Sequence, residues 1–306
     1  MIVVLAGSSG LIGTALTERL RAEGHAVRRL VRRPPRGPEE RTWDPDAGVL
    51  DPVALAGADA VVNLAGAGVG DKRLTPARKR VVLESRTRTT GLLARTVAGL
   101  DTPPRVLLQG SATGAYGYRG DEVVTEQTPY GDSFLAGVVE QWEAAAAPAV
   151  AHPDVRVAFL RTGIVLAPSG GALGKLLPLI RLGLGGPIGS GRQFWSWITL
   201  EDEIRAILHV LESDLEGPVN LTAPAPSRNA DLTRALGDAF GRPTKVAVPG
   251  FALKIALGEF SSELLGSQRV HPRVLEEAGF EFTHPTIHAA AAWVADGRSA
   301  QSSPTV

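Results

Sequence analysis

Three glycines near the start of the chain have the spacing of a phosphate-binding turn. Gly7, Gly10 and Gly13 follow an apolar run over Ile2–Ala6, and a helix-type pattern then continues to Gly24. A strand, a glycine turn and a helix in this order place the unpaired N–H groups of the helix N-terminus over the turn. Glycines also collect in loops for steric reasons alone, but their position between a strand and a helix predicts nucleotide binding. The predicted contacts are Gly7, Ser8, Ser9, Gly10, Leu11, Ile12 and Gly13.

Two arginines stand where the second strand is expected to end. The strand predicted over Ala26–Val31 runs directly into Arg32 and Arg33, and no acidic residue occupies that point. An acid there accepts hydrogen bonds from the ribose 2′-OH in NAD-specific folds, whereas a guanidinium can pair with a 2′-phosphate. The alternative is that Arg32 and Arg33 only face the solvent and bind no phosphate. We therefore expect NADP(H) to be favoured over NAD(H).

Strand-like and helix-like segments alternate along the chain and must position these groups. Helical patterns cover Pro76–Gly99 and Asp132–Ala147. Further strands are predicted at 60–64, 106–109, 155–160 and 219–221. Such alternation predicts an α/β fold: a Rossmann-type doubly wound parallel sheet with a smaller C-terminal substrate lobe.

Changes in amino-acid composition along the chain predict where domains begin and end. We expect a dinucleotide-binding domain over residues 1–248, with a glycine- and proline-rich insert for substrate at about 167–197. A helical C-terminal domain is expected over 249–298, and a polar, disordered tail over 299–306.

The composition narrows the range of partners. The 306 residues hold 32 basic and 32 acidic side chains, which argues against binding to nucleic acid or to a membrane surface. No cysteine is present, and the C-terminal histidines lack regular ligand spacing, so no metal site is expected. The first strand begins at residue 2, and no apolar stretch of about 20 residues occurs, which predicts a cytoplasmic protein without a membrane span.

Several motifs resemble an extended short-chain dehydrogenase/reductase. These are GSSGLIG at 7–13, NLAG at 63–66 and a serine-containing strand end followed by a Tyr-Gly pair at 111–117. Further segments, above all RLGLGGPIGSGRQFWSWI at 181–198 and VPGFALKIALGE at 248–259, resemble its atypical "epimerase family protein" branch, whose members are sometimes described as cell-division inhibitors. Besides the glycine turn, the resemblance implies cofactor contacts at Arg32, Arg33, Leu64, Ala65, Gly66, Arg86, Gly110, Thr162, Gly163 and Ile164.

The expected catalytic motif is incomplete. Members of the resembled family use a Tyr-x-x-x-Lys pair, in which the tyrosine transfers a proton and the lysine favours its phenolate. Tyr130 lies in a matching context, but Phe134 stands at the lysine position. Ser111, or Thr113 if the strand end is offset, is the expected hydroxyl partner. Tyr130 can equally have only a structural role, in which case proton transfer falls to another group.

Two functions therefore stay open. The first is an NADP(H)-dependent oxidoreductase or epimerase for a small carbonyl or sugar-like substrate. Trp195 and Trp197 alternate with Phe194 and Ser196, so that one face of this segment lines the substrate pocket and the other packs against the protein. The second is an NADP(H)-binding regulatory or scaffold protein whose chemistry has lapsed. The resemblance also implies a homodimer through the helices at 76–99 and 132–147, although their alanine-rich face can equally pack internally.

Overall fold

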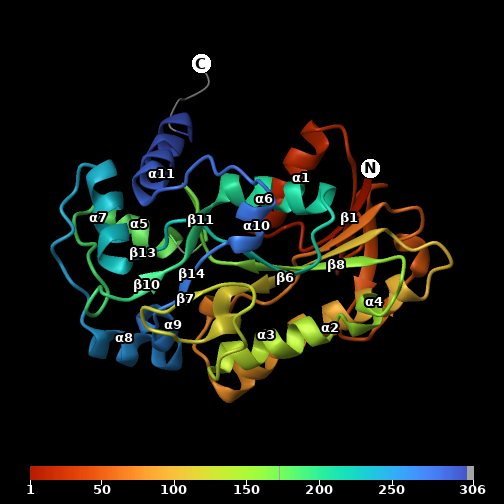
Figure 1. Cartoon of the computed structure of the whole chain (residues 1–306), viewed down its shortest axis with the longest axis horizontal. Helices are drawn as coiled ribbons and strands as arrows, with labels where there is room; N and C mark the ends of the chain where they lie inside the picture. Colours follow the sequence, from red (N-terminus) through yellow and green to blue (C-terminus); the bar gives the residue numbers. More distant parts are fainter. Residues whose placement is uncertain (172, 302–306) are drawn as a thin grey trace. The chain divides into compact units, whose positions relative to one another are not determined.

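A computed structural model describes residues 1–171 and 173–301 of the chain (Figure 1). The described chain divides into two compact units. Unit 1 comprises residues 1–115, 132–161 and 204–219, and unit 2 comprises 116–131, 162–203 and the chain from 220 onward.

Unit 1 is built on a mostly parallel sheet with the strand order β12-β8-β6-β5-β1-β2-β3-β4. Its strands are β1 (Ile2–Ala6), β2 (Ala26–Val31), β3 (Glu40–Asp44), β4 (Val49–Leu50), β5 (Ala60–Asn63), β6 (Val106–Ala112), β8 (Arg156–Thr162) and β12 (Gly217–Leu221). The pairs β1–β2, β1–β5, β2–β3 and β5–β6 are parallel, and β3–β4 is antiparallel. The predicted Rossmann-type α/β fold is confirmed.

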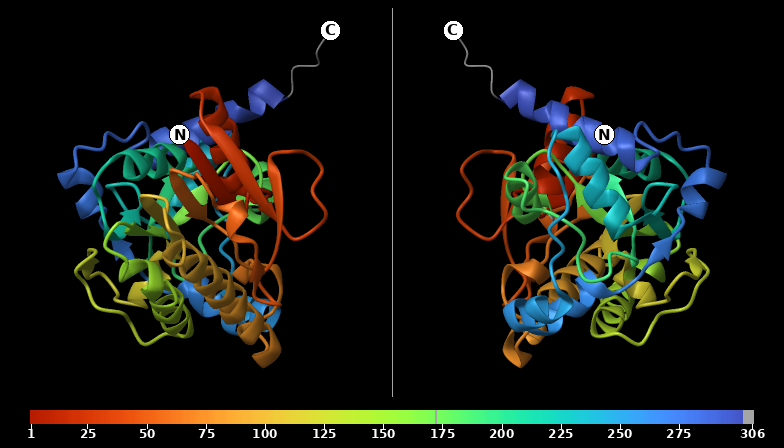
Figure 2. Two further views of the ribbon diagram at one scale, coloured as in Figure 1. Left: turned by 90° about the vertical axis from the view of Figure 1, so that its right-hand side faces the viewer. Right: turned by 90° about the vertical axis from the view of Figure 1, so that its left-hand side faces the viewer.

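Helices cover both faces of this sheet. They are α1 (Leu11–Ala22), α2 (Pro76–Ala98), α3 (Phe134–Ala144), α4 (Ala147–Val150) and α6 (Leu200–Glu212), with short 3-10 turns at Pro52–Ala54, Val69–Asp71 and Thr113–Tyr116. In Figures 1 and 2, α1 and α6 lie over one face, and α2, α3 and α4 lie over the other. Strand residues such as Val4, Val61 and Leu107 are fully buried beneath these helices.

Local chemistry sets where the helices of unit 1 begin. Thr75 caps α2 by accepting a hydrogen bond from the Arg78 backbone N–H at 3.2 Å, and Pro76 occupies the first helical position. Ser133 caps α3 in the same way, through the Ala136 N–H at 3.1 Å. By contrast, α1 begins at Gly10 without any side-chain cap. The first turn of α1 is thus the one of these three that is open to an external acceptor.

Unit 2 combines short strands with helices. The strands are β7 (Val123–Val124), β9 (Ile164–Leu166), β10 (Phe194–Trp195), β11 (Trp197–Thr199), β13 (Ser227–Arg228) and β14 (Arg269–Val270). The helices are α5 (Leu173–Arg181), α7 (Asn229–Ala239), α8 (Gly250–Leu257), α9 (Ser261–Leu265), α10 (Arg273–Glu277) and α11 (Ile287–Gln301), with a 3-10 turn at Gly258–Phe260. Trp195, Trp197, Leu236 and Ala290 belong to its hydrophobic core.

Unit 2 gathers three separate stretches of chain, whereas the sequence suggested a continuous C-terminal domain over 249–298. The boundaries 1–248 and 249–298 stay a prediction. Helix α11 extends to Gln301, so the first residues of the tail predicted over 299–306 are helical, and residues 302–306 lie outside the described chain. No helix among the described residues is long and apolar enough to cross a membrane.

Candidate functional site

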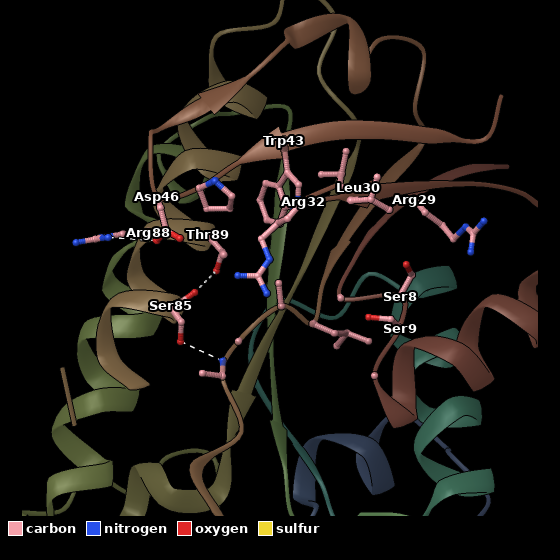
Figure 3. Close-up of a pocket in the computed structure, with 18 of the residues that line it drawn as sticks. Ser8, Ser9, Arg29, Leu30, Arg32, Trp43, Asp46, Ser85, Arg88 and Thr89 are labelled. Carbon is pink, nitrogen blue, oxygen red and sulfur yellow. Dashed lines mark hydrogen bonds and ion pairs between the residues drawn. The ribbon is translucent and has the colours of Figure 1, made fainter. Parts of the chain in front are cut away.

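A cavity of about 1040 Å³ lies at the carboxyl ends of β1, β2 and β5 in unit 1 (Figure 3). Strand β1 lies between β5 and β2, so the chain adds β2 and β3 on one side of β1 and then β5 on the other side. The strand order therefore reverses at β1. Ligands of open parallel sheets bind at such a reversal of strand order. The cavity is lined by residues 7–10, 29–33 and 64–67. Side chains from β3, from the turn after it and from α2 complete the lining: Glu40, Trp43, Pro45, Asp46, Val81, Glu84, Ser85, Arg88 and Thr89.

The glycine turn has the backbone that a phosphate site requires. Gly7 has a φ of +83°, and a Cβ there would lie 2.6 Å from the carbonyl carbon of Leu64. A Cβ on Gly13 would overlap the carbonyl oxygen of Gly7, whereas one on Gly10 would meet only that same oxygen at 3.5 Å. Gly7 and Gly13 are thus needed for the turn itself. Gly10 is not, and its missing side chain keeps the N-terminus of α1 open toward the cavity.

The two arginines at the end of β2 differ in their environments. Arg33 forms a two-pronged ion pair with the buried Glu40, with both N–O distances at 2.7 Å. The Arg33 guanidinium, with a hydrogen bond from the Arg36 backbone N–H, lowers the pKa of Glu40 to about 2. Within the described chain, the Arg32 side chain makes no hydrogen bond or ion pair. Figure 3 shows it extending into the cavity below Trp43.

The opposite wall of the cavity comes from α2 and from the segment after β3. Arg88 pairs with Asp46 at 3.2 Å and with Glu84 at 2.9 Å. Ser85 accepts a hydrogen bond from the Ala67 N–H at 3.1 Å, which fixes the loop after β5 (Figure 3). This wall presents the Asp46 carboxylate and the hydroxyl groups of Ser85 and Thr89, and β3 adds the flat indole of Trp43. Such a mixture can hold a nucleoside.

The chain after β5 lies on the floor of this cavity. The Ala65 N–H donates to the side-chain oxygen of Asn63 at 3.1 Å, and Leu64, Ala65 and Gly66 all line the cavity. Arg86, which the resemblance also implied, is turned toward protein groups: it donates to the carbonyl oxygens of Ala67 and Val82. Burial lowers the pKa of Arg86 to about 10, so its charge is retained at neutral pH.

Ser111, one of the predicted catalytic hydroxyl groups, is engaged in a buried ionic network. Its Oγ donates to the Glu143 carboxylate at 2.5 Å, and Arg161 pairs with the same carboxylate at 2.8 Å. Gly110 lies beside Asn63, because a Cβ there would come within 2.9 Å of the Asn63 carbonyl oxygen. Thr113 is buried at the start of a 3-10 turn. A catalytic role for Ser111 or Thr113 stays a prediction, and the Glu143 contact favours a structural role for Ser111.

The residues of the incomplete Tyr-x-x-x-Lys motif do not share a helix. Tyr130 lies in a non-helical segment of unit 2 with 37% of its surface exposed, and α3 begins only at Phe134 because Ser133 caps it. In unit 1, Lys79 of α2 places its ammonium 4.8 Å from the centroid of the Phe134 ring. The proton-transfer role of Tyr130 stays a prediction.

A buried carboxyl group contacts the segment of residues 162–164, which the resemblance implied as cofactor contacts. Thr162 donates to Glu203 at 2.8 Å, and the other carboxyl oxygen of Glu203 is buried without a partner among the described residues. Burial raises the pKa of Glu203 to about 8, and the Thr162 hydrogen bond offsets part of this rise. Gly163 cannot carry a side chain, since a Cβ would lie 2.7 Å from the Ser196 carbonyl oxygen, and Ile164 pairs with Trp197 between β9 and β11.

The two predicted substrate tryptophans are core residues of unit 2. Trp195 is 7% exposed and donates its indole N–H to the Leu264 carbonyl, and Trp197 is fully buried and donates to Ser227. Their contact with a substrate stays a prediction, which this burial does not favour. Phe194 alternates with Trp195 and therefore lies on the opposite face of β10. The guanidinium groups of Arg228 and Arg269 lie over its ring. The sequence did not predict this cluster of Phe194, Arg228 and Arg269, because its members come from three segments that are far apart along the chain.

Histidine and carboxylate side chains come together at one further place. Ligand atoms of Glu23, His25 and Glu212 lie within 4.8 Å of one another in unit 1. Arg19 already pairs with Glu23 at 2.6 Å, and none of these residues lines the cavity. These three side chains therefore contribute nothing to the lining of the cavity.

Comparison with known proteins assigns the chain to a family. The profile of the NAD dependent epimerase/dehydratase family matches residues 3–221. The chain belongs to this family. A second profile, described as a domain of unknown function (DUF1731), matches residues 248–294.

Individual relatives cover nearly the whole chain. An epimerase family protein of Mycobacterium bovis is 48% identical over 288 residues, which are 94% of this chain and 95% of that protein. The crystal structure of human epimerase family protein SDR39U1 with NADPH is 35% identical, with a TM-score of 0.89, and covers 97% of this chain and 99% of that one. A nucleoside-diphosphate sugar epimerase of Corynebacterium glutamicum is 37% identical, with a TM-score of 0.78 over 95% of this chain and 57% of that one. These relatives confirm the resemblance to the epimerase family proteins.

Proposed function

We propose that unit 1 binds NADP(H) in the cavity at the carboxyl ends of β1, β2 and β5, with the pyrophosphate over the glycine turn. The observation that carries this proposal is the contrast between Arg32 and Arg33. Arg33 is neutralised by Glu40, whereas Arg32 extends into the cavity with no protein anion to pair with among the described residues. A 2′-phosphate would supply that anion, because a guanidinium binds phosphate oxygens through two parallel hydrogen bonds. The NADPH named for the human relative supports the same choice.

Calorimetric titration with NADPH and NADH tests this choice. Wild-type protein should bind NADPH more tightly than NADH, and Arg32→Ala should remove most of the difference while changing NADH affinity little. Arg36→Ala is the matched control, because Arg36 is an exposed arginine four residues along that does not line the cavity. Equal affinities of the wild-type protein for the two nucleotides would overturn the preference for NADP(H).

For the chemistry, we propose an oxidoreductase or epimerase acting on a small carbonyl or sugar-like substrate. Reduction of a carbonyl takes a hydride from NADPH onto carbon and a proton onto oxygen, giving an alcohol and NADP⁺. Epimerisation would run this step in one direction and then the other, so that the cofactor is regenerated. Tyr130 remains the first candidate for the proton-transfer group, with Ser111 and Thr113 as its predicted partners. With a panel of aldehydes, ketones and sugar derivatives, nicotinamide absorbance measures net oxidation or reduction. NMR analysis of the product's configuration measures epimerisation, which leaves that absorbance unchanged.

A second function, an NADP(H)-binding regulatory or scaffold protein without turnover, is favoured by one observation. Ser111 donates to Glu143, so its hydroxyl hydrogen is already committed inside unit 1. Binding of NADPH with no turnover on any member of the substrate panel, in wild type and in Tyr130→Phe alike, would support this second function. We further propose a cytoplasmic location, and a homodimer formed through α2 and α3, for which light scattering gives the mass.

A further inference from the structure

Phe194 is the centre of a cationic cluster in unit 2. The Arg228 guanidinium lies 4.4 Å from the centroid of its ring, and the Arg269 guanidinium lies 5.0 Å from it. The cluster is anchored on backbone that is itself paired. Phe194 lies directly opposite Arg228 in the β10–β13 pair, and Arg269 is in β14, which pairs with β7. The Gln268 N–H also donates to the Phe194 carbonyl at 3.0 Å, so that β14 is tied to β10.

The two guanidinium groups are not equally satisfied. Arg228 pairs with Asp121 at 2.9 Å and also donates to the Arg192 carbonyl oxygen. Arg269 is partly buried and lies over the face of the Phe194 ring, and its guanidinium makes no hydrogen bond or ion pair among the described residues. An aromatic face attracts a cation but does not satisfy the five N–H donors of a guanidinium. With two cations and one carboxylate, the cluster has an unbalanced positive charge.

We propose that this cluster binds an oxyanion, a carboxylate or a phosphate group, through Arg269 with Arg228 beside it. Planar guanidinium groups suit either oxyanion, because both present pairs of oxygens at the right separation. The stacked ring holds the side chain of Arg269 in place, which reduces the entropy lost when the anion binds.

Calorimetric titration with inorganic phosphate, and separately with malonate, tests the site. NADPH is kept saturating so that the cavity of unit 1 is filled. Wild-type protein should bind at least one of the two anions, and the preferred one tells whether the cluster takes a phosphate or a carboxylate group. Arg269→Gln should weaken that binding about tenfold, the size expected for loss of a charge-assisted pair. Arg269→Lys should lie between the two, because it keeps the charge and loses the planar fork.

Arg234→Gln is the matched control, since Arg234 is an exposed arginine of the same unit whose side chain pairs with Asp231 alone in the part of the chain that the structure describes. Circular dichroism and NADPH affinity establish that each variant is folded. A folded Arg269→Gln variant with wild-type anion affinity overturns the proposal, as does the absence of anion binding by the wild-type protein. If NADPH itself does not bind, the proposed function fails, and the same titration in an Arg32→Ala background still decides the anion site.

Discussion

The glycine turn after β1 and the strand end at Ser111 occupy equivalent positions, each at the carboxyl end of a strand in the same sheet. At the glycine turn the helix that follows has no side-chain cap, and Arg32 beside it has no protein anion among the described residues. At the Ser111 strand end the hydroxyl group donates to Glu143, and Glu143 pairs with Arg161. The first region is arranged for an external ligand, whereas the second is internally satisfied. The structure therefore supports nucleotide binding more directly than it supports the predicted catalytic residues.

The largest expected effect tests whether the Ser111 region is structural. Glu143→Ala leaves the buried Arg161 without its carboxylate, and breaking one half of a buried ion pair costs about 3–5 kcal/mol of unfolding free energy. Urea denaturation measures this loss. Glu140→Ala, an exposed acid on the same helix, is the control and should change stability little. A Glu143→Ala variant as stable as the control would show that this network does not hold the strand end.

The next effect concerns the buried carboxyl of Glu203. Burial raises its pKa to about 8 from an ordinary value of 4.5, so the folded chain holds this proton over a range in which the unfolded chain has lost it. The contribution of Glu203 to stability is therefore fully present below about pH 4.5, falls as the pH rises to about 8, and is constant above that.

Glu203→Gln should flatten this part of the stability profile, which thermal unfolding between pH 5 and 9 measures. Glu140→Gln, at an exposed acid that forms no ion pair among the described residues, should leave the profile unchanged. An identical slope in wild type and Glu203→Gln would mean that Glu203 does not titrate in this range.

A smaller effect separates binding from folding at the glycine turn. A Cβ on Gly10 meets only the Gly7 carbonyl oxygen at 3.5 Å, so Gly10→Val should fold. Its branched side chain should block the approach of the pyrophosphate and weaken NADPH binding at least about tenfold, or ~1.4 kcal/mol. Gly137→Ala on α3, where a Cβ meets nothing within 4 Å, is the control. Wild-type NADPH affinity in a folded Gly10→Val protein would exclude this turn as the pyrophosphate site.

The smallest expected effect concerns the cation–π contact between Lys79 and Phe134, the residue at the position where the family motif has a lysine. Phe134→Leu removes the ring beneath Lys79 and should cost about 0.5–1 kcal/mol, the value of an exposed cation–π pair. Phe134→Lys should cost more, because it replaces an attraction by two like charges on neighbouring helices. Thermal unfolding of the two variants compares these costs. Greater stability of Phe134→Lys would contradict this role of the ring.

Much of unit 1 could be predicted from short stretches of sequence. The apolar run at 2–6, the glycines after it and the capped start of α2 are local signals, and the corresponding elements lie within a residue or two of the expected limits. Strands β3 and β4 were not predicted, because Glu40–Asp44 is a mostly polar run and Val49–Leu50 is only two residues long. In the structure β3 lies alongside β2, Glu40 of β3 pairs with Arg33, and β4 pairs with β3. The sequence showed that Trp195 alternates with Phe194, but it did not show which of the two side chains would be buried in the core.

The sequence by itself determined the strand, turn and helix of the proposed nucleotide site, because these three elements are consecutive and because glycine geometry depends on the local backbone. It also determined the family, through motifs spread over nearly the whole chain. Only the tertiary structure decided which polar groups remain available. Arg32 and Arg33 are adjacent and alike in sequence, and the distant Glu40 neutralises one of them. Glu143 engages Ser111, and β10, β13 and β14 bring Arg228 and Arg269 to one ring. The charge and hydrogen bonding of a side chain depend on neighbours that the fold brings from far along the chain, and local sequence does not contain them.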